Sequence, residues 1–113
     1  MQDYIKLLDL IEEVTGQDLV FMERDISKGI VYNILPITNN GTLRKDKLEI
    51  RIIGSNLVEL NQLHDKINKA LLTVGDSTDP TIRKIELNGG GLLKQPENNL
   101  YHHLAYYYIN KIN

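Results

Sequence analysis

The residues best suited to acid–base or metal chemistry in this chain are its three histidines. His102 and His103 are adjacent in a segment predicted to be a strand, so their side chains point to opposite faces and cannot hold one ion together. His64 lies in a predicted helix, without the carboxylate–histidine spacing of a metal motif. Cysteine is absent, which excludes thiolate catalysis, disulfides and cysteine-based zinc sites. We therefore predict no metal ligand, no cofactor-binding residue and no catalytic residue.

Two other segments have the composition of a binding motif but lack its spacing. No Lys-Ser or Lys-Thr pair follows Gly89, Gly90 and Gly91, and Pro96 forbids the helix that a phosphate-binding loop needs behind it. We expect a flexible hairpin loop there. The polar segment 75–80 has two aspartates but lacks the alternating oxygen ligands of a calcium loop. The chain has no G-x-S-x-G pattern, although a hydrolase triad assembled from distant residues stays an open alternative.

Composition describes an ordinary globular chain with no strong electrostatic preference. The 113 residues (12.9 kDa) are 42% hydrophobic and 25% charged, with a net charge of -2. This length predicts a single domain over residues 1–113. The charge offers no general attraction to nucleic acids or anionic membranes. For Arg44, Lys45 and Lys47 a solvated turn is the default, with contact to a phosphate as the minor alternative. No secretory signal and no apolar run of about 18 residues occurs, so we expect a cytoplasmic protein.

Hydrophobic periodicity predicts two helices separated and followed by strands. Apolar residues at helical spacing predict helices over 4–14 and 57–72, with Asp3 and Asn56 as N-caps and Gly16 ending the first. Leu60, Leu63, Ile67 and Leu71 should be buried. Strands are predicted over 19–22, 30–36, 47–53, 82–87 and 100–112, with an irregular link over 23–29 and longer loops over 36–47 and 88–99. The fold class is α+β: two main helices on a mainly antiparallel four- to five-stranded sheet, in the order α-β-β-β-α-β-β.

The last predicted strand differs from a strand with one solvated face, because both of its faces are apolar or aromatic. One face carries Leu100, His102, Leu104, Tyr106, Tyr108 and Ile112, and the other carries Tyr101, His103, Ala105, Tyr107 and Ile109. Two helices are too few to cover both faces of such a sheet. We therefore expect a contact between subunits, for which tyrosine combines apolar area with a hydroxyl that can stay hydrated.

Four segments follow a leading helix in a fixed order along the chain. They are GIVYNILP, KLEIRIIG continued by SNLVELNQLHDKINKALL, IRKIELNGGG, and NNLYHHLAYYYINKI. With these segments the chain resembles, from about residue 4 to 112, the minor capsid and tail terminator proteins of long-tailed bacteriophages and prophages. These proteins are also called tail completion or head–tail joining proteins.

The resemblance implies a non-enzymatic structural subunit of a phage or prophage particle, without a cofactor. Such subunits form a ring, typically a hexamer, that caps the tail tube and meets the head connector protein. The protein would be made in the host cytoplasm and end in the virion, with no membrane and no specific nucleic acid as partner. We place the predicted oligomer contact at Tyr101, Tyr106, Tyr107, Tyr108, Gly89, Gly90 and Gly91. The alternative is a small ligand-binding or regulatory α+β domain with a defined pocket.

Overall fold

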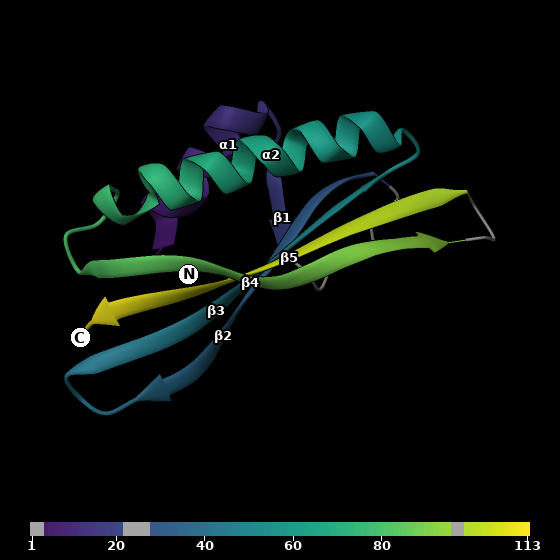
Figure 1. Cartoon of the computed structure of the whole chain (residues 1–113). Helices are drawn as coiled ribbons and strands as arrows, with labels where there is room; N and C mark the ends of the chain where they lie inside the picture. The colour runs from purple at the N-terminus through teal and green to yellow at the C-terminus, as the bar shows by residue number, and fades with distance from the viewer. Residues whose placement is uncertain (1–3, 22–27, 96–98) are drawn as a thin grey trace.

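The computed structural model describes residues 4–21, 28–95 and 99–113. The elements, in chain order, are α1 (Ile5–Thr15), β1 (Leu19–Phe21), β2 (Gly29–Asn39), β3 (Leu43–Gly54), α2 (Leu57–Thr73), the short 3-10 helix η2 (Gly75–Ser77), β4 (Ile82–Gln95) and β5 (Leu100–Ile112) (Figure 1). Asp3, Met22 and most of the predicted link over 23–29 lie outside the described residues. The predicted α+β class and the order α-β-β-β-α-β-β are confirmed.

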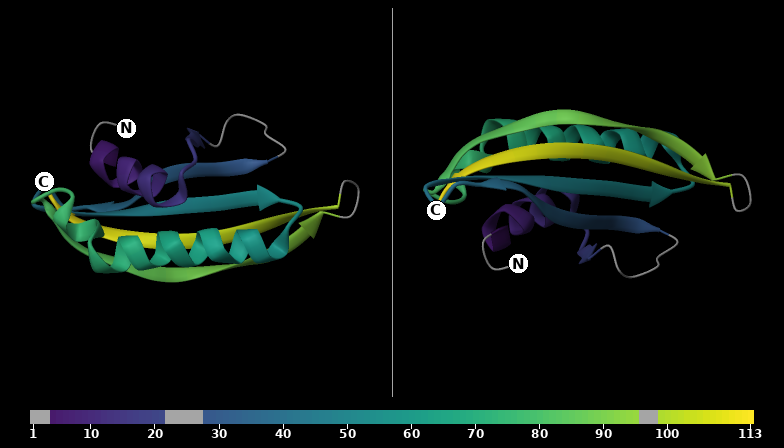
Figure 2. Two further views of the ribbon diagram at one scale, coloured as in Figure 1. Left: turned by 90° about the horizontal axis from the view of Figure 1, so that it is seen from above. Right: turned by 90° about the horizontal axis from the view of Figure 1, so that it is seen from below.

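The five strands form one mixed, mostly antiparallel sheet in the order β1-β2-β3-β5-β4. Only β1 and β2 are parallel, and they pair over three residues of each strand. The predicted hairpins β2–β3 and β4–β5 are both present, and β3 and β5 pair in the middle of the sheet. Both helices lie on the same face, so the view from below shows β4 and β5 in front of α2 (Figure 2).

Local sequence signals explain where the helices begin and end. The Asn56 side chain accepts a hydrogen bond from the Glu59 backbone N–H at 3.1 Å, so the predicted N-cap of α2 is confirmed. Gly16 ends α1 in the left-handed conformation, with φ of 68°. Among the described residues Tyr4 holds the N-cap position of α1, and its side chain makes no capping hydrogen bond. The helix predicted over 57–72 is therefore confirmed, with one additional residue at its end.

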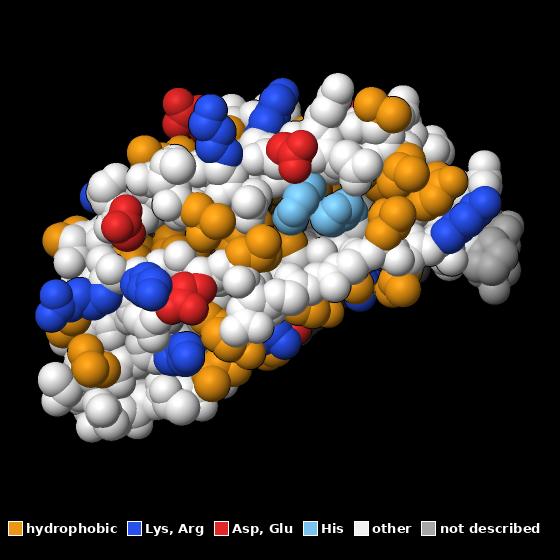
Figure 3. Space-filling view, viewed as in Figure 1, with side chains coloured by type: hydrophobic (Ala, Val, Ile, Leu, Met, Phe, Trp, Pro, Cys, Tyr) orange, Lys and Arg blue, Asp and Glu red, His pale blue; other side chains and the backbone are white. Residues whose placement is uncertain are grey.

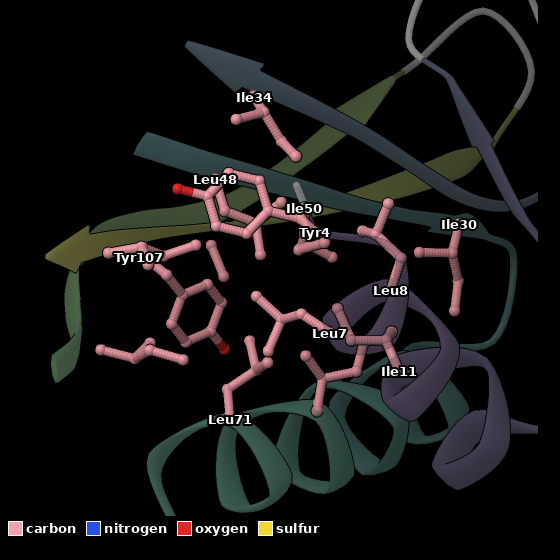
Figure 4. Close-up of a cluster of buried hydrophobic side chains, with 14 of the residues drawn as sticks. Tyr4, Leu7, Leu8, Ile11, Ile30, Ile34, Leu48, Ile50, Leu71 and Tyr107 are labelled. Atoms are coloured by element: carbon pink, nitrogen blue, oxygen red, sulfur yellow. The ribbon is translucent and has the colours of Figure 1, made fainter. Parts of the chain in front are cut away.

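One hydrophobic core lies between the helices and the covered face of the sheet. Figure 4 shows side chains from α1, α2, β2, β3 and β5 pointing toward one another across this layer. Leu60, Leu63, Ile67 and Leu71 are all buried, as their helical spacing predicts. Burial of this apolar face supplies the main driving force for folding and fixes how the sheet is presented to solvent.

The loop predicted over 36–47 is wrong, because both strands of this hairpin continue almost to its tip. The turn occupies only residues 40–42, where the Asn40 side chain accepts hydrogen bonds from the Thr42 and Leu43 backbone N–H groups. Pro36 has no N–H to donate and is tolerated because β1 pairs only with residues 30–32 of β2. The ladder shifts register between Pro36 and Thr38, which marks a bulge at this free edge.

The loop predicted over 88–99 is also wrong for its first part, since β4 runs on to Gln95. Gly89, Gly90 and Gly91 therefore lie within an edge strand instead of a hairpin loop, at a register shift between Leu87 and Gly90. Gly90 has φ of 145°, and a Cβ there would collide with the Leu104 carbonyl oxygen. The glycines thus allow a β-bulge, and residues 96–98 lie outside the described part of the chain.

Candidate interaction surface

The face of the sheet opposite the helices, called here the open face, is built by side-chain alternation along three strands. Tyr106 and Tyr108 pair in register with Glu49 and Lys47, so all four side chains share this face. Leu104 lies on the same face of β5. In the described part of the chain neither helix lies on this side (Figure 2). Tyr106 and Tyr108 are nevertheless only partly exposed, because neighbouring side chains lie against them.

Lysine side chains from β3 partly cover these two tyrosines. The Lys47 ammonium lies 4.3 Å from the centroid of the Tyr106 ring, and that of Lys45 lies 4.9 Å from the Tyr108 ring. Both are diagonal cross-strand contacts of the cation–π type. The Lys47 ammonium also lies 3.5 Å from a Glu49 carboxylate oxygen. The open face is therefore a mixed aromatic and charged surface, instead of an apolar patch.

Arg51 is the residue on this face whose polar group is least well satisfied. It lies in the middle of the sheet, opposite Val31 on one side and Leu104 on the other. Its Nε is buried and has no hydrogen-bond partner. Burial, and secondarily the charge of Arg51, lower the pKa of His102, which shares this face and hydrogen-bonds with Gln95 at 3.0 Å. A half-buried guanidinium of this kind favours an anionic partner.

The other two tyrosines of the predicted contact lie on the covered face. Tyr107 is 0% exposed, belongs to the core cluster and donates a hydrogen bond to Asn68 Oδ1 at 3.3 Å. Burial raises the pKa of its hydroxyl. Tyr101 is partly buried against the same core, with the Lys94 ammonium 5.7 Å from its ring centroid. Tyr107 therefore offers no surface to a partner of the folded chain, and Tyr101 offers little.

The three glycines of the predicted contact differ in what surrounds them. Gly90 is required by the close approach of β5, as described above. A Cβ on Gly89 would lie 3.5 Å from a Tyr106 ring carbon, whereas one on Gly91 would meet no atom within 4 Å. Gly91 is exposed on the edge strand, so its lack of a side chain leaves room for a neighbouring molecule.

The structure brings together two histidines whose proximity the sequence did not reveal. The rings of His64 on α2 and His103 on β5 are stacked, with centroids 4.3 Å apart. Both Nδ1 atoms are buried without a hydrogen-bond partner. Burial lowers the pKa of each ring, and the His64 charge lowers that of His103 further, while Asp65 opposes the shift. Figure 3 shows histidine side chains at the surface between hydrophobic ones, beside α2.

This pair lies next to a hollow of about 320 Å³ lined by Leu87, the three glycines and Leu104. The stacked planes do not converge on a common point, so the two rings are not arranged as a chelate. Among the described residues, no group of three or more histidine and carboxylate side chains is placed to share a metal ion. The helix–strand pairing that joins His64 to His103 depends on tertiary packing, which no short sequence pattern encodes.

A separate cluster of charged groups lies under the first turn of α1 and is occupied by internal contacts. The Tyr4 hydroxyl donates to Asp46, whose carboxylate also lies 3.0 Å from Arg44 Nε. The Lys111 ammonium lies 3.3 Å from a carboxylate oxygen of Asp79. Hydrogen bonds from the Thr81 backbone and hydroxyl, with Lys111, lower the pKa of Asp79. These groups anchor the helix and the loop before β4 to the sheet.

No protein-family model matches the chain, and a search of curated proteins found no significant match. None of the helices in the described residues is long and apolar enough to cross a membrane.

Proposed function

We propose that this chain is a structural protein of a phage or prophage particle, a tail terminator subunit that acts by self-assembly. Identical subunits would form a ring, with six as the expected number, on the end of the tail tube. The ring would stop growth of the tube and present a surface to the head connector. The proposal starts from the resemblance of the four quoted segments and requires no cofactor and no reaction.

The observation that carries the proposal is the open face. Its central strand places Tyr106 and Tyr108 among charged side chains, on a face that no helix of the described chain covers. Aromatic side chains surrounded by a charged rim are typical of surfaces that bind other proteins. A ring arises when one copy repeats the same head-to-tail contact and the rotation between copies closes. A small subunit with one sheet face left uncovered by its helices fits that role.

Deleting the gene from the parent phage or prophage tests the function directly. Imaging of the lysate by negative-stain electron microscopy should show overlong tails or tails without heads. Supplying the wild-type chain in trans should restore normal particles, which excludes an effect of the deletion on neighbouring genes. Normal, infectious particles from the deletion would rule the terminator role out and would favour the ligand-binding alternative.

A further inference from the structure

Two asparagine–glycine pairs occur in the sequence, Asn40–Gly41 and Asn88–Gly89. Asparagine is a thermolabile residue. A following glycine makes it more so, because no side chain keeps the glycine nitrogen away from the asparagine side chain. That nitrogen can attack the side-chain carbonyl carbon and expel ammonia, which converts the asparagine to an acid. The two pairs are chemically identical, so a difference in their reactivity must come from the fold.

Hydrogen bonds hold the first pair, which lies in the turn between β2 and β3. The Asn40 side-chain oxygen accepts hydrogen bonds from the Thr42 and Leu43 backbone N–H groups, at 3.0 and 2.7 Å. The Gly41 N–H, whose nitrogen would be the nucleophile, donates to Asn39 Oδ1 at 3.0 Å. Both reacting groups of this pair are therefore engaged, and they must leave these partners before a ring can close between them.

The second pair lies at the bulge of the edge strand β4 and lacks these restraints. Asn88 and Gly89 are exposed, and neither has a residue opposite it on β5, because the register passes from Leu87 to Gly90. In the described part of the chain the Asn88 side chain makes no hydrogen bond. Glycines at positions 89, 90 and 91 also give the backbone unusual freedom to rotate. Water and a mobile nucleophile can therefore both reach the Asn88 side chain.

We propose that Asn88 is a site of spontaneous deamidation, with water as the only other reactant. The Gly89 nitrogen gives its proton to hydroxide and bonds to Asn88 Cγ. The bond from Cγ to Nδ2 breaks, and the leaving nitrogen takes a proton from water and departs as ammonia. Water then opens the succinimide ring. Opening at the side-chain carbonyl gives aspartate, whereas opening at the backbone carbonyl gives isoaspartate. Asparagine and one water thus become an acid and ammonia, without oxidant or cofactor.

The modified peptide bond borders the open face. A Cβ on Gly89 would lie 3.5 Å from a Tyr106 ring carbon, so the backbone at this point lies close to that tyrosine. Both products add one negative charge to β4, and isoaspartate also inserts a carbon into the backbone of the bulge. Ageing of the protein therefore changes one border of the candidate interaction surface. The inference is independent of the proposed function, because it concerns the chemistry of this chain alone.

Ageing of the folded chain, followed by tryptic peptide mapping, tests the inference. Trypsin places Asn88 in the peptide 85–94 and Asn40 in the peptide 29–44, so mass spectrometry follows the two sites separately. At mildly alkaline pH the acid form of 85–94 should accumulate at least about tenfold faster, because reaction at Asn40 must first break three hydrogen bonds. The rate should rise with hydroxide concentration. Labelling by an isoaspartyl methyltransferase should identify isoaspartate in 85–94.

The unfolded chain is the control for an effect of sequence alone. In concentrated urea the two peptides should react within about threefold of each other, because the restraints of the fold are then lost. Asn39→Ala removes the acceptor of the Gly41 N–H, so it should speed the reaction at Asn40 about threefold and leave that at Asn88 unchanged. Equal rates in the folded chain, or a faster reaction at Asn40, would overturn the inference. A peptide 85–94 that reacts only in urea would overturn it as well.

Discussion

The two faces of β5 have nearly the same amino-acid types and opposite physical situations. Tyr107, Ala105 and Ile109 point under the helices and are buried, whereas Tyr106, Tyr108 and Leu104 point to the open face and stay partly exposed. The first group packs against aliphatic side chains of α1 and α2. The second group lies among lysines, glutamates and an arginine. Neighbouring tyrosines in one strand therefore have different roles. Tyr107 stabilises the folded chain, whereas Tyr106 and Tyr108 belong to a surface that faces solvent.

The comparison shows that residue type alone does not identify a binding surface. Tyr107 and Tyr108 are indistinguishable in a list of aromatic residues, and only the side covered by the helices separates them. Substitutions on the covered face should reduce stability, and those on the open face should leave the fold intact. Paired substitutions across β5 and β4 therefore test the assignment of each face directly.

The largest difference in the free energy of unfolding is expected between substitutions of the adjacent residues Tyr107 and Tyr108. Tyr107→Ala removes a fully buried ring and its hydrogen bond to Asn68, so the free energy of unfolding should fall by about 3–5 kcal/mol. Tyr108→Ala is the matched control and should cost about 1 kcal/mol or less, because its ring is already in contact with solvent. Urea titration followed by circular dichroism measures both. Equal losses for the two variants would contradict the assignment of the faces.

Two neighbouring glycines provide the next test. Gly90→Ala forces a side chain onto a positive φ and against the Leu104 carbonyl, so unfolding should become easier by about 1–3 kcal/mol or more. Gly91→Ala meets open space and no positive φ, so stability should change by less than about 1 kcal/mol in either direction. Thermal unfolding of the two purified variants gives the comparison. A stable Gly90→Ala protein would show that the bulge in β4 is not rigid.

Sequence periodicity predicted the elements and the two faces of β5 because both depend on local repeats. The spacing of Leu60, Leu63 and Ile67 identified the buried side of α2, and alternation from Leu100 to Ile112 separated the tyrosines. Local composition was a poor guide to strand length. Glycine at Gly89–Gly91 is typical of a hairpin loop and proline at position 36 of a strand end or edge, and both are tolerated inside edge strands, where bulges relax the hydrogen-bond ladder.

Contacts between distant elements could not be derived from the sequence. His64 and His103 meet only because α2 crosses β5, and Arg51 lies between Val31 and Leu104 only because β3 is central in the sheet.

The histidines on the two faces of β5 extend the comparison to the pH dependence of stability. The folded chain lowers the pKa of His64 and His103 below the ordinary 6.5, chiefly through burial. Near pH 6 the unfolded chain therefore binds more protons, so stability is full above pH 6.5 and is lost as the pH falls toward the lowered values. Urea titrations between about pH 8 and 5 should show this loss, and His103→Gln should reduce it.

The control for this change of stability with pH (the slope of the unfolding free energy against pH) is His102, the histidine on the open face of β5. His102→Gln should reduce the slope less, since no second imidazole is stacked on that ring and its shift comes from burial and Arg51. A slope that is unchanged in His103→Gln would show that the stacked pair does not govern the acid sensitivity. A larger effect of His102→Gln would show that the histidine on the open face governs the acid sensitivity instead.

The smallest effect is expected on the open face itself. Lys47→Met keeps the apolar stem but removes the ammonium 4.3 Å from the Tyr106 ring centroid and 3.5 Å from Glu49. Both contacts are partly solvated, so the loss of stability should be about 0.5–1 kcal/mol, and part of it should disappear in about 0.5 M NaCl. Lys45→Met is the control and should cost less, because its ring contact is longer, at 4.9 Å, and no carboxylate is paired with it in the described residues. A loss above about 2 kcal/mol for either variant would mean that these lysines hold the sheet together, and the open face would then be part of the chain's own structure instead of a surface available to a partner.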